Sequence, residues 1–413
     1  MAYLRRLEKQ AKSSQDINTF GDLSLSFLLW IKKLCVAAER IDFIFDTYVT
    51  ELSVKDSERA RRCNDVPIEI SMISSETPLP NNFDTFWSSS RNKEKLLNLI
   101  RSELLEEGSN IYPGVKIVLS ASGISGKTKV YPCQEITDKQ EDIQQLDIEI
   151  EEADLRIIPH ALHAASDGIS TIIILSNDTD VLVATLYFNS RIVANGATKV
   201  WMRGGIGDSA RFIPIDILAA RMGPLLCKTL PALHALTGTD CTSKFGTKAA
   251  AVKLMDSTDY LVGFGETMEI DFDKTERFLV KLWKQDFQTL DELRFFLYHQ
   301  QNKTICDLPP TSRATKAHIL RAFYQTYVTT HCLTGSTIDP TEYGFYEDGA
   351  LLKPIEAHVV LPSNMPLPCK CGICATNRCT CRKSSMPCCT YCKCAFKTMC
   401  KNPHVMLQVP VQM

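Results

Sequence analysis

The sequence lacks a long uninterrupted hydrophobic segment and carries almost no net charge. No run approaches the roughly eighteen apolar residues of a membrane-spanning helix, and the start MAYLRRLEKQAKSSQ lacks the apolar core of a secretory signal peptide. These absences argue against membrane contact and secretion, and they predict a cytosolic or nuclear protein. The net charge of −2 over 413 residues says little about partners, whereas a 45% apolar content supports a sizeable core.

Acidic residues are absent from Cys369 to the end of the chain, where cysteine is frequent. Ten of the 17 cysteines lie between Cys369 and Cys400, spaced C-x-C-x2-C-x4-C-x-C-x6-C-C-x2-C-x-C-x5-C. In a reducing compartment this pattern indicates metal ligands rather than a disulfide knot. Tetrahedral thiolate sites usually hold Zn²⁺. Ten thiolates cannot give three ions four separate ligands each, so we expect shared sulfurs in a segment that folds only with metal.

The cysteine segment resembles the CXC module of tesmin-like proteins, a zinc cluster that binds DNA. The spacing from Cys379 to Cys394 matches that module closely. Tesmin-like proteins carry two modules, each with a DNA-contacting Tyr, whereas this chain has one, with Arg378 before the matching cysteine. The resemblance leaves Cys389 as a spare and implies nine zinc ligands: Cys369, Cys371, Cys374, Cys379, Cys381, Cys388, Cys392, Cys394 and Cys400.

The rest of the chain alternates between strand and helix patterns. Residues 17–40 form a broad apolar helical face, "RNKEKLLNLIRSELLEEG" predicts a helix closed by Gly108, and "GVKIVLSAS" predicts a strand. Ile172 to Leu175 is a continuous apolar run typical of a strand buried on both faces. This alternation predicts an α/β fold with a parallel sheet flanked by helices. The predicted divisions are a helical segment 1–40, an α/β domain 41–300, a helical extension and linker 301–368, the zinc module 369–402 and a tail 403–413.

Carboxylates stand at the ends of several predicted elements. Each taken alone reads most simply as a helix cap, a solvated acid or a turn residue. Carboxylates that converge repel one another unless a cation neutralises them, which favours Mg²⁺ or Mn²⁺. Two such ions about 4 Å apart suit phosphodiester hydrolysis. The acids in question are Asp46, Glu152, Asp154, Asp178, Asp180 and Asp240.

The order of these motifs resembles the flap endonuclease superfamily of PIN-like nucleases. "FIFDTY", "EEAD", "SNDTD" and "ALTGTD" are similar to that family's metal-binding strand end, E-A-E motif, D-x-D turn and helix-two-turn-helix opening. The resemblance implies that the six acids are metal ligands in a PIN-like parallel sheet. The family's first strand with its early Asp is missing, and Pro159 falls inside a predicted helix. Strings such as "LPALHALTGTDCTSKFGTKAA" look like a group of animal proteins that spread with mobile elements.

Basic residues near these motifs are candidate phosphate contacts. A solvated helical face is the simpler interpretation of the run after Asp46, and backbone contacts without sequence readout are the alternative. The seven bases from Lys370 to Lys401 give a local charge of about +7 that suits DNA more than RNA in view of the tesmin resemblance. The candidate nucleic-acid contacts are Lys55, Arg59, Arg61, Arg62, Lys244, Lys248, Arg378, Arg382 and Lys383.

The remaining motifs give weaker indications of function. "ASGISGKT" has Ala121 where a phosphate-binding loop needs its first glycine, and no helix pattern follows, so a nucleotide cofactor is not expected. His160, His163 and His234 are predicted to be structural. Three functions stay open: a Mg²⁺- or Mn²⁺-dependent structure-specific nuclease with a DNA-binding zinc module, a DNA-binding protein that has lost the chemistry, and a mobile-element remnant. The expected location is the nucleus or the cytoplasm, with the nucleus favoured.

Overall fold

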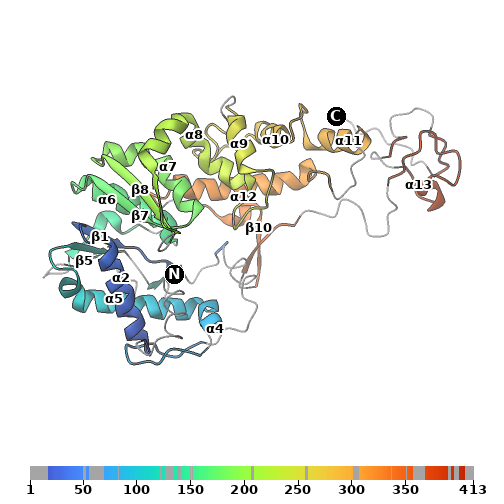
Figure 1. The fold of residues 1–413 in the computed structure, drawn as a ribbon. Helices are drawn as coiled ribbons and strands as arrows, with labels where there is room; N and C mark the ends of the chain where they lie inside the picture. The colour runs from blue at the N-terminus through green and yellow to red at the C-terminus, as the bar shows by residue number, and fades with distance from the viewer. Residues whose placement is uncertain are drawn as a thin grey trace. The chain divides into compact units, whose positions relative to one another are not determined.

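The structure is a computed structural model in which the chain forms two compact units. The first, the α/β unit, comprises Met1–Lys244, Val262–Ile270 and Arg321–Pro354, and the second, the cysteine unit, comprises Phe245–Leu261, Asp271–Leu320 and Ile355–Met413 (Figure 1). The residues described are 17–49, 53–54, 69–81, 83–120, 123–125, 134–136, 141–148, 150, 152–205, 209–255, 259–300, 307–335, 337–349, 351–356, 368–388, 392–394 and 400–404.

A four-stranded sheet occupies the first part of the α/β unit. β1 (Arg40–Phe43) pairs in parallel with β3 (Lys116–Leu119), which pairs antiparallel with β5 (Gln134–Ile136), and β5 pairs antiparallel with β6 (Glu141–Asp142). Ile41 and Phe43 of β1 are buried and lie in register with Ile117 and Leu119. A separate parallel pair joins β2 (Thr47–Val49) to β4 (Gly123–Ser125), so the described part of the glycine-rich motif is a strand.

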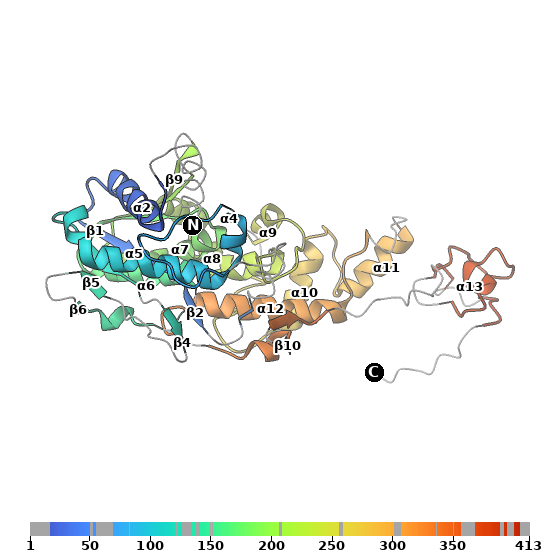
Figure 2. The same cartoon turned by 90° about the horizontal axis from the view of Figure 1, so that it is seen from below.

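Two helices pack their apolar faces together beside this sheet. α2 (Phe20–Leu34) begins with a capping box in which Thr19 and Asp22 satisfy each other's backbone N–H groups. α5 (Ser90–Ile111) crosses it (Figures 1 and 2), preceded by the short α4 (Phe83–Ser88). Phe20 and Leu23 of α2 join Leu96 and Leu104 of α5 in one buried cluster. α5 continues past Gly108, so the predicted helix end there is wrong.

A second sheet contains the apolar run seen in the sequence. β7 (Thr171–Leu175) pairs in parallel with β8 (Lys199–Gly204), which pairs antiparallel with β9 (Arg211–Pro214). Ile172 and Ile174 are buried, but Ile173 is 52% and Leu175 is 43% exposed. The expectation of a strand buried on both faces is therefore wrong for β7, which has one buried face and one open face.

Three helices accompany the second sheet and position the acids. They are α6 (Ala153–Ser166), α7 (Thr179–Ala194) and α8 (Ile215–Thr237). α6 continues through Pro159, which is buried. α8 bends at Gly223, whose φ of 79° only glycine adopts easily. After the 3-10 turns Gln144–Leu146 and Pro340–Tyr343, the remaining strands of this unit are the hairpin β10 (Phe345–Asp348) and β11 (Leu351–Pro354).

The prediction of a mixed α/β protein with helices beside sheets is confirmed, whereas that of a single parallel sheet needs correction. The described strands fall into separate small sheets, and those built around β3 and β8 each contain antiparallel pairs. For β8 and β9 the reason is the length of the connection. Only six residues join β8 to β9, and so short a connection returns the chain antiparallel, because a parallel partner needs a crossover of a dozen residues or more.

A buried ionic network joins β1 to α6. The Arg40 guanidinium donates to both Asp42 carboxylate oxygens at 2.7 and 2.8 Å and reaches Asp167 at 3.1 Å. His160 contacts Asp42 through Nδ1 at 2.7 Å, and Arg40 contacts Nδ1 of His163 at 2.9 Å. Burial disfavours the Asp42 charge, but hydrogen bonds from His160 and Arg40 hold the pKa of this carboxyl below its usual value. Both histidines therefore have structural contacts.

Helices make up much of what the structure describes of the cysteine unit. Its helices are α9 (Lys248–Met255), α10 (Phe272–Lys281), α11 (Leu290–Gln300), the first part of α12 (Ser312–Thr330) and α13 (Thr380–Lys383). Glu276 of α10 accepts from the Leu290 backbone N–H at 2.7 Å and from the Ser312 hydroxyl at 2.6 Å, which ties the starts of α11 and α12 to α10. Within the described residues, none of the helices combines the length and the hydropathy needed to span a membrane.

Candidate metal centre and acidic pocket

The cysteine segment folds around its own sulfur atoms. Six of its cysteines are buried and three are partly buried in one cluster, although so short a segment has little other apolar surface. The Cys369 sulfur lies 3.5 Å from that of Cys374, 3.8 Å from that of Cys394 and 3.9 Å from that of Cys388. Four thiolates bound to one zinc ion at about 2.3 Å stand about 3.8 Å apart, whereas a disulfide joins sulfurs at about 2.0 Å. The spacing fits metal coordination.

The sulfurs form four overlapping sets of four, and all nine predicted ligands take part. In each set the sulfurs lie within 4.8 Å of one another. Cys369 and Cys388 each belong to three sets, whereas Cys371 and Cys400 each belong to one. A donor set made of thiolates alone fits Zn²⁺. The sharing of Cys369 and Cys388 is what a cluster with bridging sulfurs requires. The sets are Cys369, Cys371, Cys374, Cys379; Cys369, Cys379, Cys381, Cys388; Cys369, Cys388, Cys392, Cys394; and Cys374, Cys388, Cys394, Cys400.

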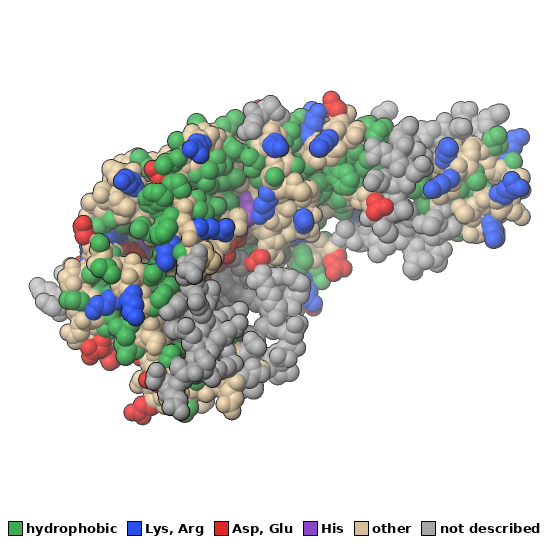
Figure 3. Space-filling view, viewed as in Figure 1, with side chains coloured by type: hydrophobic (Ala, Val, Ile, Leu, Met, Phe, Trp, Pro, Cys, Tyr) green, Lys and Arg blue, Asp and Glu red, His purple; other side chains and the backbone are tan. Residues whose placement is uncertain are grey.

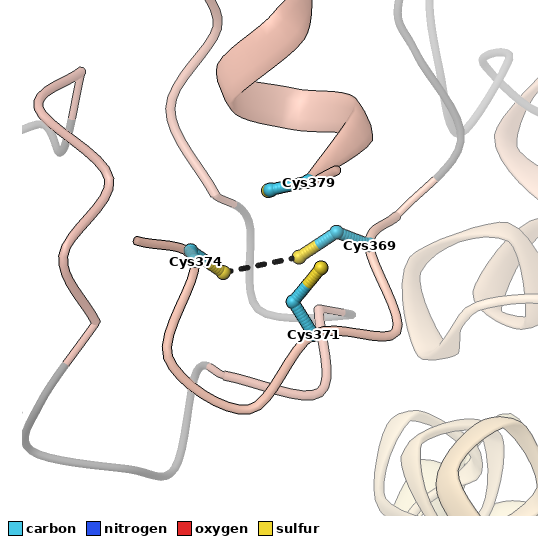
Figure 4. A group of neighbouring side chains, drawn as sticks. All are labelled: Cys369, Cys371, Cys374 and Cys379. Atoms are coloured by element: carbon cyan, nitrogen blue, oxygen red, sulfur yellow. Dashed lines mark hydrogen bonds between the residues drawn. The ribbon is translucent and has the colours of Figure 1, made fainter. Parts of the chain in front are cut away.

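The first of these sets is built from a turn and a helix start (Figure 4). Cys369, Cys371 and Cys374 come from one loop, in which Cys374 has a φ of 55°. Cys379 precedes α13 as its N-cap residue, and its sulfur accepts the Arg382 backbone N–H at 3.5 Å. The sulfur is therefore held by local backbone geometry as well as by its position in the cluster.

Burial makes several thiol groups of this cluster resist ionisation, although not all of them. Burial raises the pKa of the Cys388 thiol to about 12 and that of the Cys394 thiol to about 11. Burial also opposes ionisation of Cys379, but hydrogen bonds from the Arg382 backbone and from neighbouring thiols lower its pKa to about 7. Because zinc binds thiolates, metal binding at this site is coupled to proton release.

Arg382 connects separate parts of the cysteine segment. Its guanidinium donates to the carbonyl oxygens of Ala375 at 2.6 Å, Cys374 at 3.4 Å and Lys401 at 3.4 Å. The Lys401 backbone N–H in turn donates to the Ile373 carbonyl at 2.7 Å. Arg382, a candidate phosphate contact, therefore has a structural role as well, because it holds the end of the segment to its beginning.

The surface of the cysteine segment is basic. Figure 3 shows Lys and Arg side chains spread over its visible face. Divalent ions bound to the thiolates would offset most of their negative charge, and the segment carries seven bases and no acid. The predicted contacts Arg378 and Lys383 are exposed, as are Lys370, Lys393 and Lys401.

An acidic pocket lies in the α/β unit between α6, α7, α8 and α12. Its polar lining comprises Glu152, Asp154 and Asp180 with His234, Gln325 and Thr329. Nε2 of His234 contacts Asp180 Oδ1 at 2.6 Å. His234 lies on a buried stretch of helix as predicted, whereas no motif in the sequence indicates its contact with Asp180. Gln325 and Thr329 come from α12, a helix with no motif that would have linked it to the acids.

Asp46 adjoins this pocket through the start of α6. Its Oδ1 accepts the Ala153 backbone N–H at 2.9 Å, which places the carboxylate beside Glu152. The buried Arg156 donates to the Phe45 carbonyl at 3.2 Å and also to the Ile150 carbonyl. Arg156 thereby fixes both the chain before Asp46 and the chain before Glu152. No sequence signal distinguished this arginine.

The remaining predicted acids lie outside the pocket lining. Asp178 is exposed and acts as the N-cap of α7, with its carboxylate accepting the Asp180 backbone N–H at 2.8 Å. Asp240 is exposed in the turn after α8. The structure therefore brings together Glu152, Asp154 and Asp180, places Asp46 next to them, and leaves Asp178 and Asp240 at the surface.

The other candidate phosphate contacts are placed only in part. Lys244 and Lys248 are exposed on either side of Gly246. Lys55, Arg59, Arg61 and Arg62 lie outside the described residues, as does the spare Cys389.

Comparison of the chain with protein-family models, with curated proteins and with solved structures gives no match.

Proposed function

We propose that this protein binds nucleic acid, DNA in the first place, through a zinc-stabilised cysteine module. The observation that carries the proposal is the convergence of nine cysteine sulfurs in four overlapping sets of four. Such a core needs metal to fold, and once folded it displays bases on a rigid frame. The tesmin-like resemblance supports DNA as the ligand and the nucleus as the place of action.

The chemistry of the module surface favours the phosphate backbone over base edges. Arg378 directly precedes Cys379, the N-cap of α13, and Lys383 is the last residue of α13; both are exposed. The described part of the segment has no carboxylate that would repel phosphate. Lysine and arginine contacts to phosphate add affinity without reading sequence. We therefore propose broad DNA binding that weakens strongly with salt.

Charge removal on the module tests this proposal. The Arg378→Ala/Lys383→Ala variant should bind a labelled duplex several-fold more weakly, and its plot of log affinity against log salt should be shallower by about 2, roughly one for each lost phosphate contact. Fluorescence anisotropy across a salt series measures both. Lys281→Ala is the control and should behave like the parent. It removes a base at the end of α10 that forms an ion pair with Asp286. A parent protein with bound zinc but no salt-dependent DNA binding contradicts the proposal.

A second candidate function is divalent-metal-dependent cleavage of phosphodiester bonds in the α/β unit. The specific observation is that three acids from different elements line one pocket. Glu152 directly precedes α6, Asp154 lies in α6, and Asp180 lies in α7. Carboxylate oxygens are the ligands that Mg²⁺ and Mn²⁺ prefer. An ion held there would activate water or stabilise a leaving oxygen. The resemblance to flap endonucleases supports the same chemistry.

Cleavage of labelled flap, bubble and single-stranded DNA in Mg²⁺ or Mn²⁺ tests this second candidate. Asp154→Ala/Asp180→Ala should lower the rate by more than the roughly 10- to 100-fold typical of changes around a metal site. Asp348→Ala, in the β10–β11 hairpin and away from the pocket lining, should cleave like the parent. Equal rates in parent and double variant, or DNA binding by the parent without any cleavage, would rule out the nuclease.

A further inference from the structure

The end of the cysteine segment contains a buried amide that contacts the sulfur core. Asn402 is 3% exposed although it follows the exposed Lys401 and precedes an exposed proline. Its side-chain Nδ2 donates to the Met386 carbonyl at 2.9 Å and to the Cys388 sulfur at 3.2 Å. A buried polar side chain with such contacts holds a defined geometry.

The orientation of this amide is set by its other end. The Asn402 Oδ1 accepts the His404 backbone N–H at 3.2 Å. An amide whose oxygen takes that N–H presents its two N–H donors to the opposite side. There they meet one carbonyl oxygen and one sulfur, both of which are acceptors. The network therefore assigns the NH₂ group, and not the oxygen, to Cys388.

Cys388 is a sensitive place for such a donor. Its sulfur belongs to three of the four sets, and it lies 3.9 Å from the Cys369 sulfur and 3.8 Å from the Cys374 sulfur. A thiolate that is shared between metal ions must keep one orientation that suits each ion it binds. Donors behind a metal ligand fix that orientation and disperse its charge. Cys388 is also partly exposed, so neighbouring cysteines alone do not enclose it.

We infer that Asn402 is a positioning residue for the shared thiolate of Cys388, and that the zinc ion held by Cys374, Cys388, Cys394 and Cys400 depends on it. This set is affected most because Cys400 lies two residues before Asn402 and is also partly exposed. Movement of Asn402 would thus disturb two ligands of one ion, whereas the sets that lack Cys400 keep their remaining contacts. The inference rests on the zinc binding assumed in the proposed function, but not on DNA binding.

Asn402→Asp tests this inference in the full-length protein. The substitution keeps the size of the side chain but places a carboxylate oxygen against a thiolate. We expect native mass spectrometry to show one zinc ion fewer than in the parent. Release to excess chelator should show one phase accelerated about 10- to 100-fold, whereas the other ions, whose sets lack Cys400, are accelerated less. Asn377→Asp makes the same chemical change at an exposed position of the same segment and should leave count and rates unchanged.

Asn402→Ala distinguishes the effect of losing the N–H donor from the effect of adding a negative charge. It should also accelerate one phase, by less than Asn402→Asp, because it adds no repulsion. Equal acceleration of all ions in both variants would mean a general loosening of the segment, and parent-like counts and rates would mean no role; either result overturns the inference. If the parent retains zinc but fails to bind DNA, the proposed function fails while the comparison of zinc release remains valid.

Discussion

Replacing Cys369 by serine is expected to abolish most zinc binding and, as a consequence, to weaken DNA binding strongly. The Cys369 sulfur belongs to three of the four sets, and the residue is 1% exposed. Each structural zinc ion contributes on the order of 10 kcal/mol to the folding of a small module at neutral pH. Loss of a ligand shared by several ions should therefore unfold the segment, so that DNA affinity at moderate salt falls by about tenfold or more.

Cys371→Ser is the matched control because it removes a sulfur that belongs to one set only. This variant should retain at least the ions that do not use Cys371 and should still bind DNA measurably. Elemental analysis of the purified proteins measures zinc per chain, and anisotropy measures DNA affinity. Both quantities should be highest in the parent, lower in Cys371→Ser and lowest in Cys369→Ser. Equal zinc content in the two variants would show that Cys369 is not shared.

The cysteine core could be predicted from the sequence because its ligands are close along the chain. Spacings such as C-x-C and C-x2-C bring sulfurs together through local turns, whatever the rest of the fold does. The contact of Asn402 could not be predicted, because an asparagine after the last cysteine carries no sequence signal of its own. Its role depends on a return of the chain that places residue 402 beside residue 388.

The acidic pocket could be predicted only in part because it is assembled by tertiary contacts. Glu152, Asp154 and Asp180 stand at predicted element ends, and the structure indeed brings them together. Asp178 has the same sequence signal, but its carboxylate caps α7, which is the ordinary role of such an aspartate. The pairing of His234 with Asp180 joins residues 54 positions apart, so no local pattern reveals it.

The sheet that contains β7 could also be predicted only in part. The run from Ile172 to Leu175 predicted β7 correctly, since continuous apolar residues favour a strand over a turn. The pattern could not tell which of its faces is covered, because that depends on where distant helices pack. The short antiparallel strands β5, β6 and β9 had no distinctive alternation, and so a parallel sheet was the simplest expectation.

A second large effect is expected from Asp42→Asn, which should lower the free energy of unfolding of the α/β unit by about 3 kcal/mol at neutral pH. The side chain of Arg40 is 2% exposed and forms a two-pronged ion pair with Asp42. The substitution leaves that guanidinium with the more distant Asp167 as its anion. A buried cation that loses its main partner keeps its desolvation cost. Urea unfolding followed by far-UV circular dichroism measures the change.

The pH dependence distinguishes the loss of charge from a simple packing defect. The pKa of Asp42 is held below its usual value in the folded protein, so its contribution to stability is present above the ordinary carboxyl pKa of about 4 and is lost as the pH falls through the lowered value. The difference between parent and Asp42→Asn should therefore shrink on acidification. Asp348→Asn, at an ion pair whose carboxylate is 52% exposed, should unfold like the parent throughout. A difference that stays constant down to low pH would mean that packing, and not the ion pair, makes Asp42 important.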